Sequence, residues 1–402
     1  MKEIKVGIIG LGARGYTMFE MNILDIENVK VTALCDLYEE KIEAARKCMV
    51  EKKGYAPALC TKDYNELISS PDVDVVMIFA AWETHIPATI AAMKAGKPVG
   101  VEVAGAYSVE DCWELVKTYE KTKTPVMMLE NCCYGRNELM LLNMIKKGFF
   151  GTVVHCNGGY HHDLRGEIVG GALDAKNHGN YRFYNYRDRN CENYPTHELG
   201  PIAQMLDINR GNRMVSLVSV SSKSAGLHEY IKDKHPDNEE LMNTEFKQGD
   251  VITTVIKCAR GETITLTLDT TLPRFYSRDL KVLGTKAAFE EASNSIFLEG
   301  SGDNHETDVT THWDSAKKYA DEYEHPIWKK YLEDGIREGH GGIDWLVLNA
   351  FFDAIKENKP MPIDVYDMAS WMAVTTLSET SIALGTSVEV PDFTRGKWNL
   401  NQ

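Results

Sequence analysis

The sequence predicts an α/β protein of two domains: an amino-terminal domain with a doubly wound parallel sheet, and a carboxyl-terminal α+β domain with an open, mostly antiparallel sheet. The length of 402 residues exceeds the size at which a single hydrophobic core stops growing. The first third alternates short apolar segments with helical patterns, whereas β-branched segments dominate the middle of the chain. We therefore expect domains at residues 1–130 and 131–402.

Five apolar segments predict the strands of the first domain. They are Ile4–Ile9, Val29–Cys35, Val73–Ala80, Pro98–Glu102 and Pro125–Leu129. Helical patterns lie between them at Leu37–Lys47, Asp63–Ile68 and Ile86–Ala95. Strands that alternate with helices in this way pair in parallel, with helices on both faces of the sheet.

The second domain begins with a helical pattern at Arg136–Lys147, which Gly148 ends. Long β-branched segments then predict strands at Thr152–Tyr160, Met214–Ser222, Asp250–Ala259 and Thr263–Thr271. Helical patterns return at Asp344–Lys356 and Val365–Ala383. Because no long helices separate the strands, we expect a mostly antiparallel sheet covered by helices.

The composition excludes several classes of partner. Asp and Glu outnumber Lys and Arg by 59 to 44, a net charge of -15, which disfavours nucleic acids and anionic membrane surfaces. The nine cysteines contain no CxxC pair, as is typical of a reduced, cytoplasmic chain. The early apolar run Val6–Leu11 is too short for a signal peptide, and no later run approaches the roughly 20 residues of a membrane span.

A glycine motif directly follows the first predicted strand. It reads Gly10-Leu11-Gly12-Ala13-Arg14-Gly15, the GxGxxG spacing, and precedes a helical pattern. Gly10 permits a tight turn, Gly12 lets the backbone approach a pyrophosphate, and Gly15 allows the helix to pack closely on the strand. The helix amino terminus would stabilise the phosphate charge. The motif therefore predicts a Rossmann domain that binds a dinucleotide.

Asp36, at the end of the second predicted strand, indicates which dinucleotide. Its carboxylate should accept hydrogen bonds from the adenine ribose hydroxyls and repel a 2′-phosphate, and neither Leu37 nor Tyr38 is basic. NAD is therefore favoured over NADP. Asp36 could also cap a helix that starts at Leu37, and the two roles can coexist.

Two further segments follow the carboxyl ends of predicted strands, where ligands of open α/β sheets bind. They are Trp82-Glu83-Thr84-His85 and Glu102-Val103. Gly96-Lys97-Pro98, before a strand ending in Glu102, and the segment from Gly342 to Phe393 give the chain a resemblance to the glucose-fructose oxidoreductase and inositol dehydrogenase family. Typical dehydrogenases of that family have Glu-Lys-Pro where this chain has Glu102-Val103-Ala104, and valine cannot exchange a proton. The family's Asp-x-x-x-His element likewise reads Asn193 to His197 here.

These departures match a specialised branch of the family. The matching pieces are Trp82-Glu83-Thr84-His85, Glu102-Val103, Glu130-Asn131, Gly159-Tyr160, Tyr181-Arg182, Tyr194-Pro195-Thr196-His197, Leu199-Gly200-Pro201 and Tyr276-Ser277-Arg278. On these residues the chain resembles glycoside hydrolase family 109, the NAD-dependent α-N-acetylgalactosaminidases. With the glycine motif, the resemblance implies NAD contacts at Gly10, Gly12, Arg14, Gly15, Asp36, Trp82, His85, Glu102, Val103 and Asn131. It implies substrate contacts at Tyr160, Arg182, Tyr194, Pro195, Thr196, His197 and Tyr276.

The implied site contains Tyr, His and Arg in place of the two carboxylates of a conventional glycosidase. A bound NAD can oxidise the C3 hydroxyl of a sugar, and the resulting ketone acidifies the proton on C2. Elimination of the C1 substituent, addition of water and re-reduction of C3 would complete a redox-neutral hydrolysis.

This cycle suggests roles for two residues. His197 suits the proton acceptor at the C3 hydroxyl, because histidine exchanges protons near neutral pH. Tyr276 is the candidate base at C2, provided that Arg274 or Arg278 lowers the pKa of its phenol. Tyr and His are also common as buried, hydrogen-bonded structural residues.

Three hypotheses about the function remain: the protein is the glycosidase, a net sugar or inositol dehydrogenase, or a catalytically silent NAD-binding protein. The run His161-His162-Asp163 matches no metal-ligand spacing, and consecutive residues of a strand point to opposite faces, so we expect no metal site. We interpret Cys132-Cys133 as buried thiols. The substrate should be a small glycoside, and the open sheet predicts a homo-oligomer.

Overall fold

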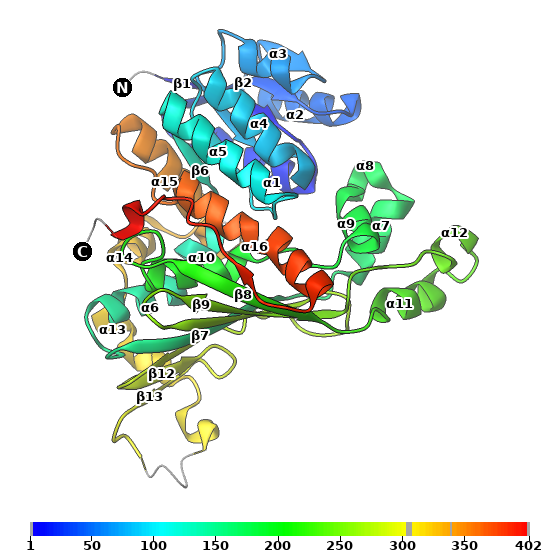
Figure 1. Ribbon diagram of the computed structural model, residues 1–402. Coiled ribbons are helices and arrows are strands. Elements are labelled where there is room, and N and C mark those ends of the chain that lie inside the picture. The colour runs from blue at the N-terminus through cyan, green and yellow to red at the C-terminus, as the bar shows by residue number, and fades with distance from the viewer. Residues whose placement is uncertain (1–2, 303–307, 338–339, 400–402) are drawn as a thin grey trace. The chain divides into compact units, whose positions relative to one another are not determined.

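A computed structural model describes residues 3–302, 308–337 and 340–399 (Figure 1). The chain forms two compact units. The first comprises Met1–Asn131, Glu167–Tyr184 and Arg337–Ala373, and the second comprises Cys132–Gly166, Asn185–Ile336 and Val374–Gln402. The first unit thus contains two late segments that the sequence prediction assigns to the second domain.

The first unit is built on a six-stranded parallel sheet with the order β3-β2-β1-β4-β5-β6. Its strands are β1 (Ile4–Ile9), β2 (Val29–Cys35), β3 (Leu59–Thr61), β4 (Val75–Ile78), β5 (Val99–Val101) and β6 (Val126–Met128). The sheet confirms the predicted doubly wound α/β class. The sequence analysis missed β3, because three residues are too few to show a pattern of strand periodicity.

The helices that belong wholly or mostly to the first unit are α1 (Ala13–Met21), α2 (Glu39–Lys53), α3 (Tyr64–Ser69), α4 (Trp82–Lys94), α5 (Val109–Thr122), α7 (Arg165–Leu173), α8 (Ala175–His178) and α15 (Ile343–Lys356). The helix α4 begins at Trp82, earlier than predicted, so that Pro87 lies inside it. The helix α5, which the sequence analysis did not predict, is capped by the Ser108 hydroxyl, which accepts a hydrogen bond from the Asp111 amide at 3.0 Å.

The second unit is built on an eight-stranded sheet with the order β13-β12-β11-β7-β10-β9-β8-β14. Its strands are β7 (Val153–His161), β8 (Met214–Ser221), β9 (Val251–Cys258), β10 (Thr263–Asp269), β11 (Lys281–Gly284), β12 (Ala287–Glu290), β13 (Ser295–Leu298) and β14 (Val388–Glu389). Only β7 and β10 pair in parallel, which confirms the predicted open, mostly antiparallel sheet. The four long strands were predicted, and the four short ones were not.

The remaining helices belong wholly or partly to the second unit. They are α6 (Arg136–Lys146), α9 (Tyr181–Asp188), α10 (Thr196–Met205), α11 (Gly226–Lys234), α12 (Glu239–Met242), α13 (Ala320–Tyr323), α14 (Pro326–Asp334) and α16 (Val365–Leu384). The helix α10 packs on β7, and α6 packs on α10. In Figure 1 the arrows of β7, β9 and β8 lie together as one sheet, with β12 and β13 toward one edge.

The two faces of the second sheet differ in burial. Along β9, buried Ile252, Thr254 and Ile256 alternate with more exposed residues, as a sheet with one covered face requires. On the exposed side, Val220 of β8 is 67% exposed and Leu283 of β11 is 40% exposed. The sheet is therefore open on one face.

No helix within residues 3–302, 308–337 and 340–399 is both long and apolar enough to cross a membrane. All nine cysteines are free thiols, and only Cys60 is exposed.

Candidate functional site

The glycine motif of the first unit forms the turn that its spacing predicts. Gly10 has a φ of +91°, and a Cβ there would lie 2.5 Å from the Ala80 nitrogen. A Cβ on Gly15 would lie 2.1 Å from the Gly10 oxygen, so α1 packs against the turn as only glycine allows. A Cβ on Gly12 would meet nothing within 4 Å. Gly12 is also the N-cap of α1 and provides no side-chain cap, so it leaves an open cradle at a helix amino terminus, which suits a pyrophosphate.

Asp36 is held beside this turn. Its carboxylate accepts hydrogen bonds from the Leu11 amide at 2.7 Å and from the Tyr38 amide at 2.9 Å. The helix α2 begins at Glu39 with Tyr38 as its N-cap. The suggestion that Asp36 caps a helix starting at Leu37 is therefore wrong. The carboxylate is instead fixed in a turn, where its remaining lone pairs can accept hydrogen bonds from the ribose hydroxyls.

A buried network gathers three of the predicted NAD contacts around Asp344. Arg14 donates from Nε to Glu102 at 2.8 Å, and its two terminal nitrogens donate to the Asp344 carboxylate at 2.7 and 2.9 Å. The Asn131 amide donates to the same carboxylate at 2.7 Å, and His340 lies 2.7 Å from it. The sequence analysis did not assign Asp344 a site role, although Asp344 lies in the Gly342 to Trp345 motif that carried the family resemblance.

The network keeps its charges despite burial. Burial opposes the charge on Asp344, but hydrogen bonds from His340 and Arg14 hold the pKa of its carboxyl well below the usual range. Burial also opposes the charge on Arg14, yet Glu102 and Asp344 together raise its pKa. With Arg14 fixed in this way, the Glu102 carboxylate is oriented, and its second oxygen accepts the Val103 amide at 3.0 Å.

His85 contacts the Ala80 segment, against which the glycine turn packs. Its ring is buried, and Nε2 lies 2.8 Å from the Ala80 carbonyl oxygen, to which it can donate. Burial lowers the pKa of His85 to about 4, so the ring is neutral at physiological pH. Because Ala80 is the residue against which Gly10 packs, His85 holds the segment that faces the glycine turn.

Trp82, a predicted NAD contact, meets Arg182, a predicted substrate contact. The Arg182 guanidinium lies 4.9 Å from the centre of the Trp82 ring, a cation–π distance, and Tyr181 packs 5.1 Å from the same ring. Arg182 also pairs with Glu167 at 3.0 Å. The first unit therefore holds a residue predicted for the sugar next to one predicted for the cofactor.

The second unit brings the other predicted substrate residues together in an aromatic cluster. We define it as Tyr160, His162, Tyr194, His197 and Tyr276. The Tyr160 ring lies 4.6 Å from that of Tyr194, 5.4 Å from that of His197 and 6.3 Å from that of Tyr276. Tyr194 and His197 are also neighbours, at 4.7 Å. His162, which the sequence analysis weighed only as a metal ligand, lies in the cluster 5.1 Å from the ring of Tyr276.

Pro195 and Thr196 begin the helix that carries His197. Pro195 is the N-cap of α10, and Thr196 is buried with no hydrogen-bond partner for its hydroxyl among the described residues. The neighbouring Asn193 donates to Gln248 at 2.7 Å and accepts from the Cys191 thiol at 3.3 Å. The asparagine that replaces the dehydrogenase aspartate thus serves a buried amide network.

The predicted lowering of the Tyr276 pKa is wrong. Although 52% of Tyr276 is exposed, desolvation raises its pKa above the usual range, and the charge of Arg278 offsets this only in part. Arg274 is paired with Asp269 and Arg278 with Glu138, so each cation shares its charge with a carboxylate. Tyr276 is therefore a protonated phenol, able to donate a hydrogen bond or a proton.

Arg278 joins the elements that carry the cluster. It pairs with Glu138 of α6, and its Nε lies 3.8 Å from a carboxylate oxygen of Glu198, the neighbour of His197 on α10. Both glutamates are buried. On β7, a Cβ at Gly158 would meet the Glu198 side chain at 2.1 Å, so the strand that carries Tyr160 makes room for this carboxylate.

Glu192 is a buried carboxyl that the sequence analysis missed. It is 1% exposed, and one of its oxygens has no hydrogen-bond partner within the described part of the chain. Burial raises its pKa to about 8, so the carboxyl is largely protonated at neutral pH. The other oxygen lies 3.4 Å from the Tyr194 amide, which places this acid directly behind the cluster. No sequence pattern distinguishes it from a surface glutamate.

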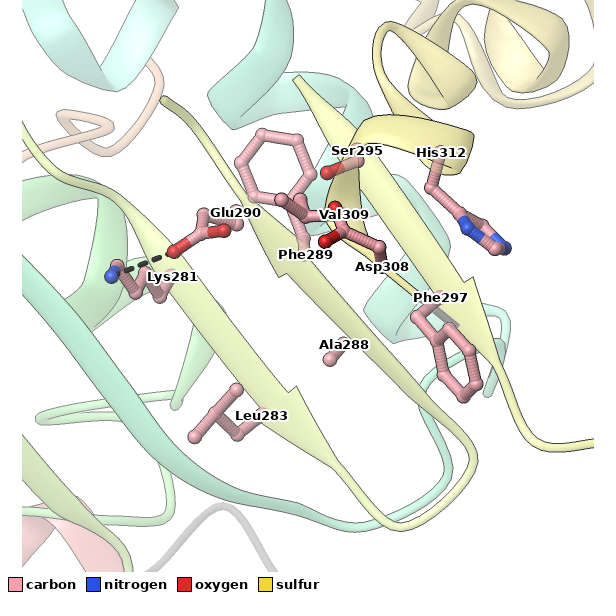
Figure 2. Close-up of a pocket in the computed structure, with 10 residues that line it drawn as sticks. All are labelled: Lys281, Leu283, Ala288, Phe289, Glu290, Ser295, Phe297, Asp308, Val309 and His312. Carbon is pink, nitrogen blue, oxygen red and sulfur yellow. Dashed lines mark ion pairs between the residues drawn. The ribbon is translucent and has the colours of Figure 1, made fainter. Parts of the chain in front are cut away.

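A hollow of about 300 Å³ lies elsewhere in the second unit. Figure 2 shows that side chains of β11, β12 and β13 line it together with Asp308, Val309 and His312, and that Lys281 and Glu290 form an ion pair at one side. It contains no predicted site residue.

Comparison with known proteins is consistent with this geometry. Residues 134–400 match the family model "Glycosyl hydrolase 109, C-terminal domain", and residues 4–130 match "Oxidoreductase family, NAD-binding Rossmann fold". A glycosyl hydrolase family 109 protein of Stenotrophomonas maltophilia is 40% identical, over 99% of this chain and 90% of that protein. The alpha-N-acetylgalactosaminidase of Tannerella forsythia is 37% identical, over 98% of this chain and 87% of that protein. The structure of a levoglucosan dehydrogenase complex with NADH and levoglucosan shares the fold, with a TM-score of 0.68 and 17% identity over 96% of this chain and 99% of that one.

The open space at Gly12 and the close backbone contact at Gly15 predict different effects of an alanine substitution on NAD binding and on stability. Gly12→Ala should leave the melting temperature near that of the wild type and weaken NAD binding, because the new methyl group occupies the space left for the pyrophosphate. Gly15→Ala should lower the free energy of unfolding by about 1–3 kcal/mol, because its methyl group collides with backbone. Thermal melts and NAD titration of both variants test this, and normal NAD affinity in Gly12→Ala would contradict the assignment.

Glu192 predicts a pH dependence of stability. Its pKa is raised from 4.5 to about 8 in the folded state, so between these pH values the folded protein binds a proton that the unfolded chain releases. Stability should therefore fall as the pH rises through this window, by up to about 1.4 kcal/mol per unit. Glu192→Gln should flatten this slope in urea unfolding, whereas Glu299→Gln, at an exposed site, should not. An unchanged slope in Glu192→Gln would contradict the prediction.

Proposed function

This chain belongs to glycosyl hydrolase family 109, and from that membership we propose that it hydrolyses α-N-acetylgalactosaminides with the help of a retained NAD. The observation that carries the proposal is the aromatic cluster, in which four of the substrate positions implied by the family, Tyr160, Tyr194, His197 and Tyr276, lie side by side. Its side chains are phenols and imidazoles. Proton transfer at such a site would pass through Tyr and His, where a displacement mechanism would use two carboxylates.

The residues of the first unit fit NAD. The open cradle at Gly12 would take the pyrophosphate, Asp36 would accept the ribose hydroxyls, and the Arg14–Glu102 pair would present a fixed carboxylate to the cofactor. When bound, NAD supplies a hydride acceptor for C3 of the sugar and later returns the hydride to the same carbon.

The proposed cycle assigns proton transfers to the cluster. His197 would accept the proton of the C3 hydroxyl as that carbon is oxidised. Tyr276, which stays protonated, would donate its proton to the oxygen that leaves C1. Tyr194 would orient the sugar hydroxyl and acetamido groups. Val103, which is buried beside Glu102, occupies the position at which the dehydrogenase pattern has a lysine. This difference distinguishes the site from the implied dehydrogenase pattern.

The proposal predicts the fate of two isotopic labels. With an N-acetylgalactosaminide deuterated at C2, the product should lose the label to solvent, because C2 is deprotonated by a group in contact with water. Deuterium at C3 should remain in the product, because the hydride returns to the carbon from which it came. Mass spectrometry of the product, with parallel assay of nitrophenol and NADH, measures all three quantities.

Complete retention of the C2 label would exclude elimination. Stoichiometric NADH without nitrophenol would support the dehydrogenase alternative, and the absence of both products would support the catalytically silent one.

His197→Ala and Tyr276→Phe should lower turnover by about 100-fold or more, the usual effect of losing an acid or base. Both should stay within about 1 kcal/mol of wild-type stability, because neither side chain is fully buried. Steady-state kinetics and thermal melts measure the two effects. Near-normal turnover in both variants would overturn the assigned roles.

A further inference from the structure

We propose that the segment Glu167–Tyr184 is a strap that closes over bound NAD and slows its release, an inference that rests on the retained NAD of the proposed function. This segment belongs to the first unit, whereas the residues on both sides of it, Cys132–Gly166 and Asn185–Ile336, belong to the second. The chain therefore leaves the second unit at this point, contacts the nucleotide-binding unit and returns. We call Glu167–Tyr184 the strap.

The strap contacts the nucleotide-binding unit at two anchors. At the first anchor, Lys176 of α8 forms an ion pair with Glu40 of α2 at 2.8 Å, and its ammonium lies 5.7 Å from the centre of the Tyr38 ring. At the second anchor, the ring of Tyr181 packs 5.1 Å from the ring of Trp82. Both anchors join side chains that are far apart in the sequence.

The two anchors lie on either side of the glycine turn. Tyr38 follows β2 and Trp82 follows β4, and the strand between β2 and β4 in the sheet is β1, whose carboxyl end carries the turn. Neighbouring strands are about 4.8 Å apart, so β2 and β4 are separated by roughly 10 Å. The residues from Lys176 to Tyr181 are numerous enough to span this distance. The strap therefore crosses the sheet edge at which the pyrophosphate would bind.

Two glycines let the strap fold tightly between its anchors. A Cβ on Gly171 would lie 2.5 Å from the Gly179 carbonyl oxygen, so the end of α7 packs on the bend that follows α8. Gly179 has a φ of +70°, in the left-handed region that glycine adopts without a steric penalty. The strap is thus a folded element that can move as one piece.

The two anchors differ in burial. Trp82 is 6% exposed, whereas the side chains of Lys176 and Glu40 are 60% and 56% exposed. Exposed ion pairs are weak and are screened by salt, whereas buried ring contacts are not. The strap should therefore open at Lys176 and stay fixed at Trp82. Because it crosses the edge that holds the cofactor, its opening would limit the rate at which NAD leaves.

The test measures how fast bound NAD exchanges in the full-length protein. Holoprotein loaded with radiolabelled NAD is mixed with excess unlabelled NAD, and the label that stays bound is counted after rapid desalting. Lys176→Ala should speed the exchange by about 3- to 10-fold, because it removes both the ion pair and the cation–π contact. Lys176→Arg, which can keep both contacts, should exchange within about two-fold of the wild type.

The matched control is Lys47→Ala. Lys47 also lies on the surface of the first unit, where it pairs with Glu51 of the same helix, α2, at 3.8 Å. This substitution removes an exposed lysine and its ion pair without touching the strap, so NAD exchange should stay within about two-fold of the wild type.

Ionic strength separates the action of the ion pair from a general loss of structure. Raising the salt concentration from about 0.05 to 0.5 M should speed NAD exchange more in the wild type than in Lys176→Ala, because only the wild type has the Lys176–Glu40 pair to screen. Lys47→Ala should respond to salt as the wild type does.

Equal NAD exchange in Lys176→Ala and the wild type would overturn the inference, and so would an equal salt effect in these two proteins. Glycoside cleavage by the wild type together with unchanged exchange in Lys176→Ala would overturn the strap alone. Faster exchange in Lys176→Ala, in a protein that cleaves no glycoside, would support the strap and overturn the proposed function.

Discussion

The aromatic cluster of the second unit depends on one guanidinium, that of Arg278. Arg278 lies between Glu138 and Glu198, which come from two different helices and are both buried. Without a cation between them, two carboxylates in that position would each carry a large desolvation penalty, and removal of one partner of a buried pair commonly costs about 3–5 kcal/mol. The same residue is two positions from Tyr276, and Glu198 is next to His197. The ion network therefore fixes the spacing of the groups proposed to transfer protons.

The first unit also contains an arginine that is shared by two carboxylates. Arg14 bridges Glu102 and Asp344, and the bidentate contact to Asp344 sets the plane of the guanidinium. In both units a partly buried arginine shared by two carboxylates organises the site, and such preorganisation lowers the cost of ordering on binding. The carboxylates that hold these arginines are committed to ion pairs, which leaves proton transfer to other side chains.

Sequence reasoning identified the elements whose signals are local. The GxGxxG spacing specified a tight turn, an open cradle and a close helix contact, and each glycine has the surroundings that its position requires. The short strands β11 to β14 gave no signal, because two to four residues cannot show a period. Asp344 was missed as a site residue because its partners Arg14 and Asn131 are distant in sequence, and Glu192 was missed because no local pattern shows its burial. The pKa of Tyr276 was mispredicted for a related reason: desolvation in the folded protein raises it more than Arg278, two residues along the chain, lowers it.

This distribution of charge bears on which glycosidase chemistry the cluster can perform. A displacement mechanism needs two carboxyl groups about 5–10 Å apart that face the sugar and can ionise separately. Glu138 and Glu198 are taken by Arg278, and Glu192 is buried behind Tyr194 with a pKa of about 8. The cluster itself consists of phenols and imidazoles, whose proton affinities suit transfer to and from hydroxyl and carbon acids. Such groups can transfer a proton from C2 once a neighbouring ketone has acidified it. The site chemistry and the nucleotide-binding unit in the same chain therefore support the same proposal, in which the cofactor would make weak acids and bases adequate.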